Sequence, residues 1–132
     1  MPRTNKRNAA TTPRSPTARS RVTNGKDILP GIDNRSPIAR RYRDIVAQLA
    51  SDQGGADRMS EARVQLCRRF AAVACMSEAM EAELANGKVI DIGEHCLLSS
   101  TLVRLASRIG INRTAHEIVP TLREYIEIAE PA

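Results

Sequence analysis

The sequence predicts an all-α protein built around a long antiparallel helical hairpin. Three observations lead to this prediction. Apolar side chains recur at helical spacings over two stretches between residues 60 and 111. Residues suited to helix caps bound each stretch. The joint between the stretches, residues 88–90, is so short that the two helices must run antiparallel.

Residues 1–23 predict a disordered basic tail, because they contain almost no large apolar side chain with which to offset the entropy of ordering. Residues 1–26 carry seven positive charges and no acid, whereas the formal net charge of the whole chain is +5. Such a segment neutralises phosphates, which predicts salt-sensitive, sequence-independent DNA binding. A tail that only confers solubility is the alternative. The cations concerned are Arg3, Lys6, Arg7, Arg14, Arg19, Arg21 and Lys26.

Residues 24–35 predict a turn-rich tether, since Pro30-Gly31 and the neighbouring Asn, Asp and Gly residues have turn chemistry. Ile28, Leu29 and Ile32 form an apolar patch in this tether that is suited to docking on the helices. A helical domain is then expected over residues 36–130.

The first helix is expected to begin at Ser36-Pro37, an N-cap followed by a proline in the first position, and to end at Gly54-Gly55. Its outward face carries three cations in four positions, which either grip a phosphate backbone or form an ordinary solvated face. These cations are Arg40, Arg41 and Arg43. The inward stripe is expected to consist of Ile38, Tyr42, Ile45, Val46 and Leu49.

The first arm of the hairpin is expected to run from the N-cap Ser60 to Asn86-Gly87, a length of about 40 Å. The second arm begins near the N-cap Asp91, ends at Gly110 and has roughly 19 residues. A single hairpin cannot bury both apolar strips, so flanking helices or a second copy of the chain must cover them. A homo-oligomer is therefore expected. The core or oligomer residues are Leu66, Phe70, Val73, Met80, Leu84, Leu98, Leu102, Leu105 and Ile109.

A short final helix is expected after Pro120. Glu124, Glu127 and Glu130 make it acidic, so it is a candidate contact for a partner protein or a neighbouring subunit, with a solvated outer face as the alternative.

The sequence contains none of the common catalytic signatures. It lacks a phosphate-binding glycine loop, a GxSxG nucleophile elbow and an HExxH metal motif. We therefore expect no enzyme activity, no cofactor and no metal. An enzyme with Arg63, Arg69 and Arg104 around an anionic substrate is the alternative, although no general base accompanies them.

The cysteines and the hydropathy pattern bear on the cellular compartment. Cys67, Cys75 and Cys96 match no zinc spacing and are expected to be free, reduced and mostly buried. No apolar run approaches 18 residues, and the N-terminus lacks the hydrophobic core of a secretory signal. A soluble cytoplasmic protein without a membrane contact is expected.

A series of short motifs runs through about residues 24 to 114. They are Asn24-Gly25, Leu29-Pro30-Gly31-Ile32-Asp33, Arg35-Ser36, Arg40-Arg41-Tyr42-Arg43-Asp44, Gly54-Gly55-Ala56-Asp57, Arg68-Arg69, Leu102-Val103-Arg104-Leu105 and Ile109-Gly110-Ile111-Asn112-Arg113. In this order they resemble the small subunit of phage terminases, a family encoded by bacterial prophages. The resemblance implies a ring-forming adaptor that marks viral DNA and regulates a separate large subunit, which holds the ATPase and the nuclease.

Two functions follow as expectations. The first is a non-catalytic DNA-packaging adaptor that binds double-stranded DNA through its tail and the first-helix arginines, oligomerises through its hairpin and works with the large terminase subunit. A helix-turn-helix reader of DNA, common in that family, is not evident here, so contacts with the DNA backbone are expected. The second is a helical protein–protein interaction or scaffold module with no nucleic-acid role.

Overall fold

The computed structural model describes residues 19–114 and residue 126. Its regular structure consists of three α-helices and one short 3-10 turn: α1 (Pro37–Asp52), η2 (Ala56–Arg58), α2 (Glu61–Ala85) and α3 (Ile92–Ile109). The described residues include no β-strand, so the predicted all-α fold class is confirmed. The predictions for residues 1–18 and for a short helix after Pro120 fall outside the described residues, Ile126 excepted.

Each helix begins where a side chain satisfies a backbone N–H group of its first turn. The Ser36 hydroxyl accepts a hydrogen bond from the N–H of Ala39 at the start of α1. The hydroxyl of Ser60 caps α2 and the carboxylate of Asp91 caps α3 in the same way. All three predicted helix starts are confirmed.

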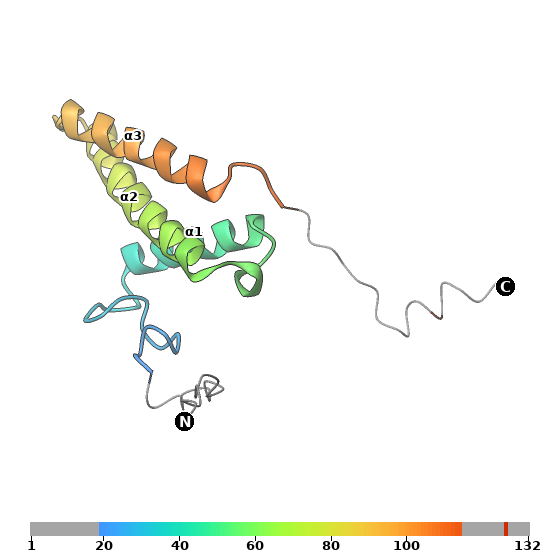
Figure 1. Ribbon diagram of the computed structural model, residues 1–132. Helices are drawn as coiled ribbons and strands as arrows, with labels where there is room; N and C mark the ends of the chain where they lie inside the picture. Colours follow the sequence, from blue (N-terminus) through green and yellow to red (C-terminus); the bar gives the residue numbers. More distant parts are fainter. Residues whose placement is uncertain (1–18, 115–125, 127–132) are drawn as a thin grey trace, which may run out of the picture.

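The two arms form the antiparallel hairpin that the sequence predicts. Beyond α2, the N–H groups of Gly87 and Lys88 each donate to a carbonyl of the last turn, at 3.0 Å, and Gly87 adopts a φ of +78° that favours glycine. The chain then reverses, and α3 runs back along α2 (Figure 1). Figure 1 also shows the connecting loop pointing away from α1, so the far end of the hairpin projects beyond the three-helix body.

The interior lies where α1 crosses α2. Tyr42 of α1 packs against Ala71 and Cys75 of α2, and all three are buried. Ile28 and Leu29 of the tether pack on the same cluster, as the sequence predicts, whereas Ile32 of the same predicted patch is 40% exposed. The tether therefore covers one side of the α1–α2 contact.

The most buried positions of α2 are small residues. Cys67, Ala71 and Cys75 are at most 5% exposed, whereas Leu84 is 56% exposed in this chain. Because α2 lies between α1 and α3, it buries two faces, and small side chains on the α1 face let the helices approach closely. The predicted residues that the structure leaves half-buried are Leu66, Phe70, Val73 and Met80 on α2, with Leu98, Leu102 and Leu105 on α3.

The end of α3 is tied to the end of α1. Ile109 is 2% exposed, and the buried Gln53 side chain donates from Nε2 to the carbonyl of Gly110 at 3.1 Å. The N–H of Thr114 donates to the carbonyl of Asp52 at 2.7 Å. Residue 114 therefore leaves the body at the C-terminal end of α1.

A hydrogen-bonded turn precedes the tether. The hydroxyls of Ser20 and Thr23 lie 2.8 Å apart, and the N–H of Lys26 donates to the carbonyl of Arg21. The boundary predicted at residue 23 falls inside this turn. The Asn34 side chain then closes the tether by accepting from the N–H of Ile28 and donating to the carbonyl of Lys26.

The cysteines are free, and two of the three are buried. Burial raises the pKa of the Cys67 and Cys75 thiols. Cys96 is exposed on α3, so the expectation of burial fails at this position, which lies on the face of α3 that turns away from α2.

Candidate nucleic-acid interface

The cations predicted to bind DNA occupy three different settings. Arg3, Lys6, Arg7 and Arg14 lie outside the described residues. Arg19, Arg21 and Lys26 lie in or beside the hydrogen-bonded turn at the start of the tether, and Arg40, Arg41 and Arg43 lie on α1.

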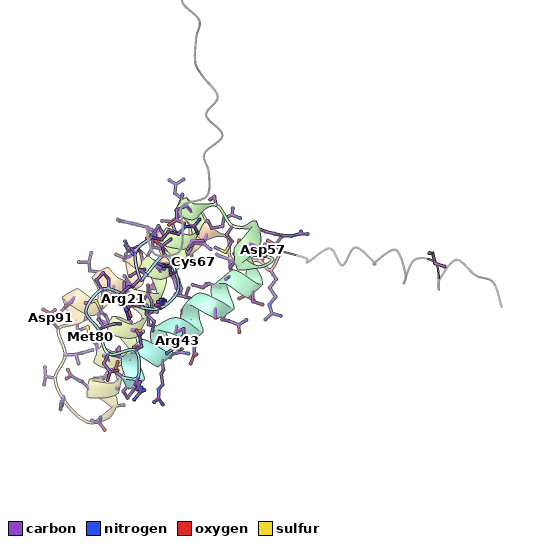
Figure 2. All side chains as sticks on the ribbon, turned by 90° about the horizontal axis from the view of Figure 1, so that it is seen from below. Arg21, Arg43, Asp57, Cys67, Met80 and Asp91 are labelled. Carbon is purple, nitrogen blue, oxygen red and sulfur yellow. The ribbon has the colours of Figure 1, made fainter. Side chains whose placement is uncertain are left out.

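Arg21 is engaged within the turn. Its Nε donates to Oδ2 of Asp27 at 2.6 Å and its Nη2 donates to Oδ1 at 3.1 Å. These hydrogen bonds hold the pKa of the Asp27 carboxyl below its ordinary value. Figure 2 labels Arg21 in this turn and Arg43 on α1. The Arg21 guanidinium therefore stabilises this turn by pairing with Asp27, and it is not a free charge.

Arg41 and Arg43 are engaged between elements. Arg41 forms a two-pronged ion pair with Glu78 of α2, with Nη2 2.6 Å from Oε1 and Nε 2.9 Å from Oε2. Arg43 donates from Nη2 to the carbonyl of Asn34 at 3.0 Å. Both guanidinium groups thus attach α1 to its neighbours, and a phosphate would have to displace those contacts.

The Arg41–Glu78 pair predicts a small pH-dependent effect on stability. Hydrogen bonds from Arg41 lower the pKa of the Glu78 carboxyl, so the stabilisation is present above the ordinary carboxyl pKa of about 4.3 and is lost as the pH falls through the lowered folded-state value. Both side chains are largely exposed, which limits the effect. Urea unfolding of Glu78→Gln should show a slightly lower midpoint than wild type at pH 7 and a smaller deficit at pH 2.5. An equal deficit at both pH values would contradict this assignment.

Three of the predicted cations in the described part of the chain are unpaired. The side chains of Arg19, Lys26 and Arg40 make no hydrogen bond or ion pair with any residue of the described chain. Arg40 lies on the side of α1 opposite the buried Ala39 and Tyr42. Of the three arginines on α1, Arg40 is therefore the one most accessible to a phosphate.

The hairpin gathers further arginines at one end. Because α2 and α3 are antiparallel, residues 58–69 and residues 104–113 lie at the same end of the hairpin, which we call the arginine-rich end. The first range has four arginines and one glutamate, and the second has three arginines and no acid. The arginines are Arg58, Arg63, Arg68, Arg69, Arg104, Arg108 and Arg113.

The opposite end of the hairpin is acidic. Residues 78–94, which we call the acidic tip, contain five carboxylates and one lysine. Asp57 and Asp91 mark the two ends of the helical body in Figure 2, and Asp91 belongs to the acidic tip. The hairpin is therefore electrically polarised along its length. Sequence reasoning grouped Arg63, Arg69 and Arg104, and the antiparallel alignment of the two helices adds Arg58, Arg68, Arg108 and Arg113 to the same end.

Arg104 and Arg108 form the best-placed pair at the arginine-rich end. They are one helical turn apart, so they project from the same face of α3, and both are exposed. Together with Thr101 and Ser107 they line a shallow hollow of about 550 Å³. Neither guanidinium makes a hydrogen bond or ion pair with another described residue. The lining of this hollow does not include Arg63 or Arg69, so the structure does not gather those two around Arg104 there.

His95, Ser77 and Glu81 form a hydrogen-bonded cluster whose geometry does not match that of a catalytic triad. Nε2 of His95 lies 3.3 Å from the Ser77 hydroxyl and 3.1 Å from Oε1 of Glu81. Both contacts use the same ring nitrogen, whereas a catalytic triad needs the serine and the carboxylate on opposite nitrogens. The three side chains join α3 to α2.

Other kinds of site are not found in the described part of the chain. No group of three or more His, Cys, Asp or Glu side chains there is placed to hold a metal ion. No described helix is both long enough and apolar enough to cross a membrane.

Comparisons of the chain with models of protein families, with curated proteins and with solved structures find no match.

Proposed function

We propose that this chain is a non-catalytic helical adaptor that binds double-stranded DNA through its cationic tail and the arginine-rich end, and that assembles with copies of itself. Guanidinium groups bind phosphate oxygens in a two-pronged manner, and contacts of this kind carry no base specificity. The resemblance to phage terminase small subunits supports a role in viral DNA packaging beside a large subunit.

The exposed Arg104–Arg108 pair is the observation on which this proposal depends most. The two guanidinium groups share one face of α3, and neither forms an ion pair with a described carboxylate, whereas Arg113 at the same end is paired with Asp52 at 2.9 Å. The adjoining hollow leaves room for a DNA backbone to approach α3. The unpaired Arg40 and the tail add cations that the same polyanion attracts.

DNA affinity measured by fluorescence anisotropy across a salt series tests this proposal. Each lost phosphate contact should reduce the slope of log K against log salt by about 0.9. We expect Arg104→Ala/Arg108→Ala to reduce the slope by nearly twice that amount and to weaken binding to unrelated duplexes equally. Affinity that does not change with salt, or that is unaffected in this variant, would refute the interface.

A matched control removes a charge that is already neutralised. Arg41→Ala/Glu78→Ala keeps the net charge of the chain and should leave the salt slope unchanged, because Arg41 is held by Glu78. A loss equal to that of Arg104→Ala/Arg108→Ala would mean that the loss reflects general damage to the fold. Assembly is tested separately by light scattering, where a stable monomer at micromolar concentration would count against self-association.

A scaffold module without a nucleic-acid role is the second candidate, and an apolar groove beside α1 and α2 favours it. This groove has a volume of about 620 Å³. Absence of any DNA binding at low salt would favour this candidate over the first.

A further inference from the structure

The apolar groove lies between the tether, the beginning of α1 and the middle of α2. Ile32, Ile38 and Met76 line it and are 40%, 57% and 51% exposed, which is high for large apolar side chains. On α2, Ala72, Met76 and Ala79 recur at spacings of four and three, so this side of the groove is a helical stripe of small and adaptable side chains.

The chemistry of the groove selects an apolar occupant. Asp33, Ser36 and Tyr42 carry the charged and hydroxyl groups in its lining, and the side chains of Asp33 and Ser36 are engaged locally. Oδ1 of Asp33 accepts from the N–H of Arg35 at 2.9 Å, and the Ser36 hydroxyl caps α1. Because no cation lines the groove, a phosphate or another anion has no partner there. An amphipathic helix laid along α2 fits a groove of this kind.

The C-terminal segment of the same chain carries a matching apolar stripe. Leu122, Tyr125, Ile126 and Ala129 fall on one side of a helical projection, and Glu124 and Glu127 fall on the other. Ile126, which is the described residue of this segment, is helical, and its side chain is 52% exposed. Packing this stripe into the groove would remove both apolar surfaces from water.

The point at which the chain leaves the helical body makes the contact reachable. Thr114 is hydrogen-bonded to Asp52, and Tyr42 and Ile38 lie ten and fourteen residues before Asp52 on α1, a distance of about 15 to 21 Å. Residues 115–120 span up to about 20 Å when extended. A linker of this length gives the segment an effective concentration in the millimolar range, which favours it over a free partner.

We propose that the C-terminal segment, residues 121–129, docks as a helix in the groove formed by the tether, α1 and α2 of its own chain. It becomes a fourth helix of the bundle, with its apolar stripe on Ile38 and Met76 and its glutamates facing solvent. The groove lining includes neither Arg104 nor Arg108, so the proposal holds or fails independently of DNA binding by that pair.

Disulfide trapping in the full-length chain tests the contact. The Cys96→Ser background removes the exposed native thiol, and Ile38→Cys/Ile126→Cys places one thiol in the groove and one on the stripe. Mild oxidation should give an intramolecular cross-link, read by non-reducing electrophoresis and peptide mass spectrometry, at least ten-fold faster than the control Val89→Cys/Ile126→Cys. Val89 suits the control because it is 98% exposed on the loop of the hairpin. A rate no faster than the control, or a cross-link formed only between two chains, would overturn the proposal.

A second measurement does not depend on introduced thiols. Leu122→Asp/Ile126→Asp should release the segment, uncover the groove and raise the fluorescence of a bound apolar dye several-fold, while circular dichroism retains the signal of α1 to α3. Glu124→Gln/Glu127→Gln changes side chains on the side of the helix opposite the apolar stripe, so it should leave dye binding at the wild-type level. Equal dye binding by all three proteins would show that the segment does not cover the groove.

Discussion

Tyr42→Ala is expected to lower the free energy of unfolding by about 3 to 5 kcal/mol, which is the usual cost of deleting a buried aromatic ring. Tyr42 is 7% exposed and stands at the centre of the α1–α2 contact, where Ala71, Cys75 and the tether surround it. The neighbours on α2 are small side chains on a rigid helix, so they leave much of the cavity unfilled. Since small domains are stable by about 5 to 15 kcal/mol, this variant would lose a large share of its stability.

Urea unfolding followed by circular dichroism measures this loss. Tyr42→Phe is the control, because it keeps the ring and removes a hydroxyl that forms no hydrogen bond with the described residues. A loss below 1 kcal/mol for Tyr42→Ala would mean that α1 contributes little to the stability of the hairpin. A large loss for Tyr42→Phe would instead assign the effect to the hydroxyl.

Ala71→Leu should destabilise the protein by about 1 to 3 kcal/mol, because it inserts a larger side chain into a closed contact. Ala71 is 0% exposed on the α2 face that meets α1, and its size is what allows the two helices to approach. The added carbons must force α1 away from α2 or shift Tyr42 from its packing. Thermal unfolding should show a lower midpoint, and the far-ultraviolet spectrum should remain helical.

Ala82→Leu tests the reason for that loss. Ala82 lies on the same helix but is exposed, and leucine has nearly the helix propensity of alanine. Its unfolding midpoint should stay close to that of wild type. If Ala82→Leu and Ala71→Leu destabilise the protein equally, the effect arises from the helix itself and the close approach of α1 and α2 is not its cause.

The helices could be predicted from the sequence because their ends are marked by local chemistry. Ser36, Ser60 and Asp91 each cap the helix that follows, and Gly87 takes the left-handed conformation that ends α2. These signals act over three or four residues, so no knowledge of the tertiary structure is needed to find them.

The packing was harder to predict because it depends on which faces meet. Large apolar side chains at helical spacing predicted that Leu84 is a core residue. The structure instead buries Cys67, Ala71 and Cys75 of α2. The far end of α2, where Leu84 lies, extends past α1, and the Leu84 side chain is 56% exposed. The size of an apolar side chain predicts how much its burial stabilises the fold. The place where α1 crosses α2 decides which side chains are buried.

The candidate site was predicted in part, for a similar reason. The cations of α1 could be found by counting charges in the sequence. That count could not show that Arg41 forms an ion pair with Glu78, which lies 37 residues further along the chain. It also grouped Arg104 with Arg63 and Arg69, whereas the hollow beside Arg104 is lined by Arg108 and by neither of those two. A sequence does not distinguish a charged side chain that is paired from one that is unpaired.

The polarised hairpin gives the molecule a large electric dipole moment directed along its longest helices. A polyanion attracts the end that bears Arg104 and Arg108 and repels the end that bears Asp91, so the two forces turn the molecule in the same sense before contact. The loop after α2 would then face away from the nucleic acid. At physiological ionic strength, screening limits this torque to separations of about 8 Å between the protein and the polyanion. The molecule is therefore oriented only in the last stage of its approach.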